Sequence, residues 1–319
     1  DYAKTYLTIV SCSGPFVLIA NCYSNVIRAE GQSGKAMMGQ LLGNLLNVIL
    51  DPIMILVFGW NIAGAAIATV IGQIFACVFA LVLNLKKNPE LHLVFRGFRP
   101  NWRIIGSIYA IGLPSVVMMA IGSVMTFLMN KILITYHSAR ETAATAFGIY
   151  FKLNSFFFMP LFGLNNAVVP IVAYNYGARN RGRIHQAIRT STITAVTIML
   201  LGWAAFFFLP VPLLRLFDAS EAMIAIGIPA FRITSFTYPL AAVSIVASSV
   251  FQALGKSIYS MLVSLGRQLI VLIPVAYLFS LTGVLDDVWL AFPIAEVVCL
   301  ISSLFFLKKV LHRLDDFPQ

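Results

Sequence analysis

Charged residues are scarce in this sequence, and their scarcity excludes most classes of soluble protein. Asp, Glu, Lys and Arg make up 11% of the 319 residues, whereas 60% of the residues are hydrophobic. A typical soluble domain is about 25% charged. So few charged side chains cannot cover the surface of a soluble enzyme, and so many apolar residues are not found in disordered chains. The composition therefore predicts an all-α integral membrane protein.

The sequence also lacks the motifs of enzyme and metal chemistry. It contains no HExxH, DDxxD, Walker or GxSxG motif. Its four cysteines, Cys12, Cys22, Cys77 and Cys299, fall within apolar stretches, without CxxC or His-paired spacing. We interpret them as small buried hydrophobes rather than as disulfide or zinc ligands. We therefore expect no catalytic residues, no bound cofactor and no ATPase in this chain.

Long apolar runs are present instead. A membrane-spanning helix needs about 20 mostly apolar residues. Because Pro114, Pro160 and Pro170 interrupt two of the longer runs, we expect kinks there. Nine spanning helices are predicted, at residues 5–27, 36–58, 62–84, 106–135, 142–174, 187–209, 224–252, 257–281 and 288–310.

The basic residues predict how these helices are oriented. The net charge is +10, and 15 of the 22 Lys and Arg residues fall in one set of alternate loops, with only three in the opposite loops. Loops rich in Lys and Arg stay on the cytoplasmic side. We therefore expect the loops 28–35, 85–103 and 177–189 and the C-terminus to be cytoplasmic, and residue 1 to lie outside. The membrane explains the positive charge, so no nucleic-acid partner is expected.

The chain repeats itself with an offset of 222 to 224 residues. For example, Gly43 corresponds to Gly266 and Gln73 to Glu296. Such repeats are typical of transporters, here as two pseudo-symmetric six-helix lobes. The same arithmetic predicts three further helices, about 120 residues, before residue 1. We expect residues 1–87 to be the last three helices of the N-terminal lobe, 88–103 a cytoplasmic linker, and 104–319 the complete C-terminal lobe.

The predicted helix 36–58 carries four polar residues on one face. Gln40, Asn44, Asn47 and Asp51 fall within an arc of about 60° on an α-helix. A carboxylate inside a membrane costs about 2.5–3.5 kcal/mol and persists where it has partners. Thr69 on the next helix could complete a proton site or a hard-cation site. The alternative is that the acid and the following proline only end a short helix near the outer surface.

Other polar residues within the predicted spans suggest two further roles. Glu296 has Arg267 in the neighbouring span as a partner, and we favour a structural ion pair over a coupling role. The span 142–174 combines many aromatic residues with amides, which suits large apolar or cationic ligands. Lys152 in this span either pairs with an acid or contacts substrate. The residues that we expect to line a substrate cavity are Tyr150, Lys152, Asn154, Asn165 and Asn166.

The order and spacing of five segments resemble those of the multidrug and toxic compound extrusion (MATE) family. The resemblance implies a monomeric antiporter in a bacterial plasma (inner) membrane. It would export amphipathic, often cationic drugs in exchange for Na+ or H+. The segments are 25–38 (NVIRAEGQSGKAMM), 44–52 (NLLNVILDP), 59–69 (GWNIAGAAIAT), 111–114 (IGLP) and 148–184 (GIYFKLNSFFFMPLFGLNNAVVPIVAYNYGARNRGRI).

The resemblance also implies where the coupling ion binds. Several family members use an acid on helix one with polar groups on helices five and six, and the matching residues are Asn47, Asp51 and Thr69. These three would be the metal ligands if the ion is Na+. Other members use second-lobe carboxylates, but the spans 106–135 and 224–252 contain no internal Asp or Glu. This departure favours coupling in the first lobe.

Two other functions are alternatives to the exporter. A flippase for lipid-linked oligosaccharides would need several basic residues in its cavity for pyrophosphate. Only Lys131, Lys152 and Arg267 are candidates. An integral-membrane lipid enzyme would need a cluster of acids or histidines at the membrane face, and the sequence shows none. The exporter therefore remains the favoured function.

Overall fold

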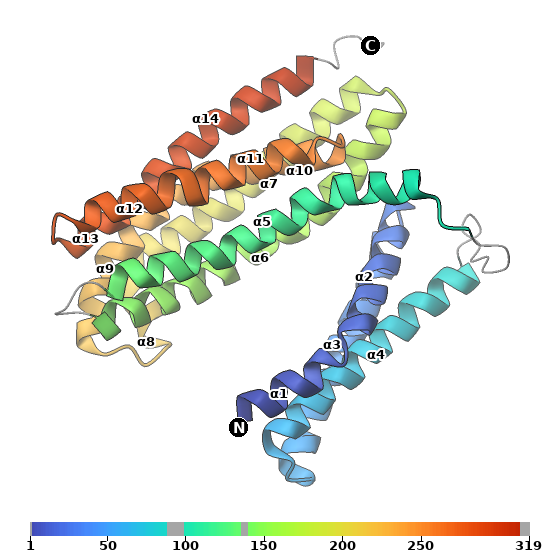
Figure 1. The fold of residues 1–319 in the computed structure, drawn as a ribbon, viewed down its shortest axis with the longest axis horizontal. Helices are drawn as coiled ribbons and strands as arrows, with labels where there is room; N and C mark the ends of the chain where they lie inside the picture. The colour runs from blue at the N-terminus through green and yellow to red at the C-terminus, as the bar shows by residue number, and fades with distance from the viewer. Residues whose placement is uncertain (1, 88–98, 135–139, 313–319) are drawn as a thin grey trace. The chain divides into compact units, whose positions relative to one another are not determined.

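The computed structural model describes residues 2–87, 99–134 and 140–312 as helices joined by short connections (Figure 1). No strand occurs in these ranges. Seven helices are long and apolar enough to cross a membrane, and up to nine spans result if each of two bent helix pairs counts as one. The predicted all-α membrane fold is confirmed. Of the predicted linker 88–103, residues 88–98 lie outside the described residues.

Contacts divide the chain into two compact units, unit 1 (Asp1–Pro100) and unit 2 (Asn101–Gln319). In unit 1, α3 packs against α4, and α1 and α2 also pack on α4. A short π-helix, η1, continues α3 beyond its last residue. The elements of unit 1 are α1 (Tyr2–Ser11), α2 (Gly14–Ala29), α3 (Ser33–Pro52), η1 (Ile53–Val57) and α4 (Asn61–Lys87).

The contact between α3 and α4 depends on two glycines. A Cβ atom added to Gly43 would lie 2.7 Å from the carbonyl oxygen of Gly72, and one added to Gly72 would lie 2.6 Å from that of Gly43. Small residues of this kind let two membrane helices approach backbone to backbone. The close approach brings Asn47 and Thr69, one turn from these glycines, within reach of each other.

Gly43→Ala is therefore expected to destabilise unit 1 by about 1–3 kcal/mol, because the new methyl group meets backbone atoms that cannot rotate away. Gly34→Ala on the same helix is the matched control, since nothing lies within 4 Å of its Cβ position. Alanine favours a helix by about 1 kcal/mol over glycine, so the control should be neutral or stabilising. Thermal unfolding in detergent measures both, and equal melting temperatures would contradict the proposed packing.

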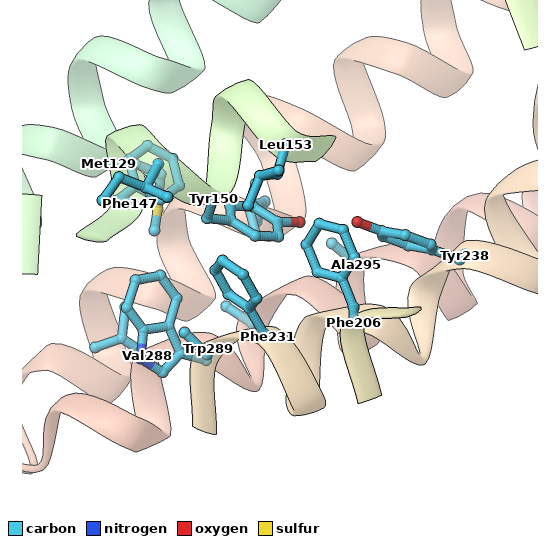
Figure 2. Close-up of a cluster of buried hydrophobic side chains, with 14 of the residues drawn as sticks. Met129, Phe147, Tyr150, Leu153, Phe206, Phe231, Tyr238, Val288, Trp289 and Ala295 are labelled. Carbon is cyan, nitrogen blue, oxygen red and sulfur yellow. The ribbon is translucent and has the colours of Figure 1, made fainter. Parts of the chain in front are cut away.

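Unit 2 is a larger helical bundle with an aromatic core. Phe206 and Phe231 pack with ring centroids 4.8 Å apart, and Trp289 stacks near Phe147. Figure 2 shows these rings gathered around Tyr150. The elements are α5 (Trp102–Ile134), α6 (Arg140–Gly177), α7 (Arg181–Phe208), α8 (Pro210–Arg215), α9 (Glu221–Ser235), α10 (Thr237–Ala253), α11 (Ser257–Leu265), η2 (Gly266–Leu272), α12 (Ile273–Ser280), α13 (Leu285–Trp289) and α14 (Ala291–His312).

Two sharp bends occur at breaks between consecutive helices, where the sequence analysis predicted none. Helices α5 and α6 continue through Pro114, Pro160 and Pro170 without interruption. Instead, α1 and α2 meet at 48°, and α9 and α10 at 47°. Pro15 lies in the first turn of α2 and Pro239 in the first turn of α10. Proline is favoured there, because the first-turn N–H groups have no helical partner.

Candidate functional site

Asp51, Asn47 and Thr69 form one hydrogen-bonded cluster between α3 and α4. The Nδ2 group of Asn47 donates to Asp51 Oδ1 at 3.3 Å and to Thr69 Oγ1 at 3.4 Å. Thr69 in turn donates to the carbonyl oxygen of Ala65 at 2.9 Å. All three side chains are half-buried. The spacing of four residues on α3 places Asn47 one turn from the acid, where it can bridge to α4.

The acid does not lie at the end of its helical segment. Pro52 follows Asp51, but the chain continues as η1 to Val57, and Ser33–Val57 together form one candidate span of 25 residues. Proline has no backbone N–H and interrupts the regular hydrogen-bond pattern of an α-helix, and here the chain continues past it as a π-helical turn. Such turns are frequent at functional sites. The polar cluster is thus part of a continuous apolar span.

Gln40 lies about three turns from Asp51 on the same helix and belongs to a second cluster. Its Oε1 accepts from Arg28 Nη2 at 3.3 Å, and its Nε2 donates to Asn21 Oδ1 at 3.4 Å. Asn21 was not predicted. An amide in the apolar stretch 5–27 was the available signal, but the sequence does not show which helix it faces.

A cavity of about 300 Å³ lies between the two clusters of unit 1. Asp51 is not among the residues that line it. The Oε1 atom of Gln73 is buried and has no hydrogen-bond partner within the described residues. The cavity therefore has a wall of neutral amides next to a single carboxylate. Its polar lining residues are Asn21, Gln40, Asn44, Asn47, Thr69 and Gln73.

The donor set limits what this site can bind. Across the residues that the structure describes, no group of three or more His, Cys, Asp or Glu side chains is placed to share a metal ion. One carboxylate with amide and hydroxyl oxygens is instead suited to a proton or a hard monovalent cation. Of the predicted group Gln40, Asn44, Asn47, Asp51 and Thr69, the last three form the acid cluster, and all except Asp51 line the cavity.

In unit 2, a second cavity of about 280 Å³ is lined by only part of the predicted set. Tyr150 and Asn154 line it. Lys152 and Asn166 are exposed and do not, and Asn165 accepts a hydrogen bond from Ser249 on α10 instead. Helical geometry explains the first difference, because residues 150 and 154 share a face of α6 whereas residue 152 is rotated by about 200° from residue 150.

Arg267 and Glu296 form the expected ion pair and also contribute to the cavity wall. Arg267 Nη1 lies 3.1 Å from Glu296 Oε2. Glu296 is 5% exposed, and its Oε1 atom has no partner among the described residues. Arg267 lies in η2, the second π-helical segment. The sequence indicated the pairing but gave no sign that both residues line a cavity with Tyr150 and Asn154.

The long apolar helices and the polar-lined cavities within them define a multi-pass membrane transporter. The family model MatE matches residues 114–278, which is just over half of the chain. The chain therefore belongs to the MatE family, and the resemblance predicted from its segments is confirmed.

Similar proteins include two curated multidrug export proteins. The chain is 28% identical over 315 residues to multidrug export protein MepA of Staphylococcus aureus (strain NCTC 8325), covering 98% of this chain and 68% of that protein. It is 27% identical to MepA of Staphylococcus saprophyticus, with the same coverage. A MOP superfamily transporter structure from Pyrococcus furiosus is 25% identical with a TM-score of 0.90, covering 98% of this chain and 70% of that one.

Proposed function

We propose that the protein is a secondary active exporter of amphipathic, often cationic drugs, driven by the inward flow of Na+ or H+. The hydrogen-bonded cluster of Asp51, Asn47 and Thr69 beside the unit 1 cavity is the observation that carries this proposal. The similarity to multidrug export protein MepA supports the substrate class. We place the protein in a bacterial plasma membrane, as a monomer with a cytoplasmic C-terminus.

In this proposal, Asp51 is the coupling carboxylate. Within the described residues, Asn47 uses its Nδ2 group in both of its hydrogen bonds, which leaves its Oδ1 atom for an ion. Oxygens from Asp51, Asn47 and Thr69 would then hold Na+, or Asp51 alone would take a proton. Either event neutralises the acid. A carboxylate in an apolar surrounding strongly favours one compensating positive charge. That charge can come from the entering cation or from a cationic drug, so entry of the one can be coupled to release of the other.

The flippase alternative needs several cavity arginines or lysines. Of Lys131, Lys152 and Arg267, only Arg267 lines the unit 2 cavity, and Glu296 neutralises it. A single paired guanidinium is a weak receptor for a pyrophosphate. The lipid-enzyme alternative would require a cluster of acids or histidines, and no such cluster supports it in the described ranges. We therefore favour the exporter.

The proposal predicts that everted membrane vesicles containing the full-length protein accumulate ethidium when they are energised. Accumulation should fall to the level of vector-only vesicles when ionophores collapse the Na+ and H+ gradients, because in this proposal those gradients supply the energy for export. If vesicles without any ion gradient accumulated ethidium at the same rate as energised vesicles, the transporter would not be ion-coupled.

A further inference from the structure

A groove of about 350 Å³ lies between α6 and α7, apart from the two cavities described above. Residues 178–180 alone join these helices, which pack against each other as antiparallel neighbours. Both helices belong to candidate membrane spans. The α6 wall of the groove is largely apolar and includes Leu164, Val168 and Ile171. In a membrane, the surroundings of such a wall are lipid chains.

The α7 wall of the groove is polar, and its polarity changes along the helix. Arg183 and Gln186 lie near the connection to α6, whereas Thr190, Ser191 and Thr194 lie deeper in the span. All five fall on one face of α7, within an arc of about 140°. With a rise of about 1.5 Å per residue, Arg183 and Ser191 are about 12 Å apart along the helix. The groove thus runs from a charged end to an uncharged end, as a phospholipid does.

Two polar side chains in this wall keep their hydrogen-bonding capacity for a ligand. The backbone N–H of Arg183 donates to Asn180 Oδ1, but its guanidinium forms no hydrogen bond or ion pair within the described residues. Ser191 is 7% exposed, and its hydroxyl forms no hydrogen bond within the same ranges. The neighbouring Thr192 instead donates to the carbonyl oxygen of Ile188, as helical hydroxyls often do. Because an unsatisfied buried hydroxyl is costly, a ligand oxygen beside Ser191 would stabilise the groove.

The charged end of the groove carries an excess of positive charge. Residues 177–189 contain four arginines, and no Asp or Glu occurs between Glu141 and Asp218. The N-terminus of α7 lies at the same end and adds partial positive charge. We expect this end on the cytoplasmic side, where anionic lipid headgroups attract basic segments. Charge and position therefore favour an anionic partner that also has an apolar part.

We propose that this groove binds an anionic phospholipid of the cytoplasmic leaflet. The phosphate oxygens accept hydrogen bonds from Arg183 and Gln186, an ester carbonyl accepts one from Ser191, and an acyl chain follows Ile171 and Leu164 into the bilayer. Basic pockets between membrane helices bind anionic headgroups. The groove volume is at the lower end of the range of about 300–1,000 Å³ for ligand sites, which suits a headgroup whose chains remain in the bilayer. This partner is separate from the drugs and the coupling ion of the proposed function.

Two lipids with the same acyl chains test this assignment. Dioleoyl phosphatidylglycerol is anionic, whereas dioleoyl phosphatidylcholine carries its phosphate together with a cationic ammonium group. Native mass spectrometry of the full-length protein in detergent measures the affinity for each, in about 0.15 M ammonium acetate, which screens exposed charges more than about 8 Å apart. Phosphatidylglycerol should bind at least about tenfold more tightly, because no ammonium group opposes Arg183. Glycerol phosphate, the same headgroup without chains, should bind at least about tenfold more weakly than phosphatidylglycerol.

Arg183→Gln should weaken the binding of phosphatidylglycerol about tenfold, because it removes a charge-assisted hydrogen bond to the phosphate. Arg189→Gln is the matched control, since it makes the same change of charge on the same helix. Arg189 is exposed but lies outside the groove lining. This control should keep the affinity for phosphatidylglycerol within about twofold of the wild-type value.

A second variant tests the groove without changing any charge. Ala167 lines the groove and is exposed, so Ala167→Leu should fold normally and occupy the space of the acyl chain. It should weaken the binding of phosphatidylglycerol at least about fivefold.

Four results would overturn the assignment. They are equal wild-type affinities for the two lipids, equal losses of affinity in Arg183→Gln and Arg189→Gln, unchanged binding in Ala167→Leu, and glycerol phosphate that binds as tightly as the lipid. Ethidium transport in vesicles reports separately whether the exporter proposal itself holds.

Discussion

Asp51→Asn is expected to reduce cation-driven ethidium transport to the background level in vesicles with matched amounts of protein. The substitution keeps the shape of the side chain, and its carbonyl oxygen can still accept the hydrogen bond from Asn47. It removes the only negative charge of the cluster, and with it the group that we propose to bind a proton or Na+. Removing a charge from a membrane span lowers the insertion cost by about 2.5–3.5 kcal/mol, so expression should not fall.

Asp286→Asn provides the matched control for this variant. Asp286 is exposed and lies in the short helix α13, outside both cavity linings. It should transport ethidium like the wild type. Glu296→Gln should have a smaller effect than Asp51→Asn, because the equivalent residue in unit 1 is already the neutral Gln73. Full transport by Asp51→Asn, or a loss confined to Glu296→Gln, would mean that Asp51 is not the coupling carboxylate.

Arg267→Leu is expected to destabilise unit 2 by about 3–5 kcal/mol, because it leaves a buried carboxylate without its counter-ion. Glu296 is 5% exposed and has its one ionic contact with Arg267 in the described part of the chain. The double variant Arg267→Asn with Glu296→Gln removes both charges and should recover most of the lost stability. Thermal unfolding in detergent, followed by size-exclusion chromatography, compares the two.

Arg232→Leu is the control for the loss of an arginine without a buried partner. Its side chain is exposed and its recorded contact is with the Phe207 ring, 5.7 Å from the centroid. This variant should unfold near the wild-type temperature. If Arg267→Leu unfolded at the same temperature as the double variant, leaving Glu296 without its partner would cost no stability. The ion pair would then not stabilise the fold.

Helical spacing was sufficient to predict contacts along one helix and between neighbours in sequence. The four-residue steps on α3 placed Asn47 next to Asp51, and the short connection from α3 to α4 placed Thr69 beside them. Likewise, the neighbouring spans of Arg267 and Glu296 made their pairing predictable. These predictions succeed because the geometry of a helix fixes which residues share a face.

Which face of the aromatic helix α6 looks inward was not predictable. In a soluble protein the apolar side of a helix marks the interior, but lipid is as apolar as a protein core, so apolar residues cover every face of a membrane helix. Lys152 and Tyr150 therefore looked equally suited to a cavity, although Tyr150 lines the unit 2 cavity and Lys152 does not. The partnership of Asn21 with Gln40 joins residues 19 positions apart on separate helices, and no spacing rule reports it.

The central claim, that a cation held at Asp51 drives drug export, is tested most directly with purified full-length protein in proteoliposomes. Wild-type protein and Asp51→Asn would be compared while a Na+ gradient or a pH gradient is imposed as the sole source of energy. The account predicts that one of the two gradients drives ethidium uptake against its own gradient by the wild type, that inverting the ion gradient reverses the flow, and that Asp51→Asn shows neither. Uptake that ignores both ion gradients, or persists unchanged in Asp51→Asn, would contradict it.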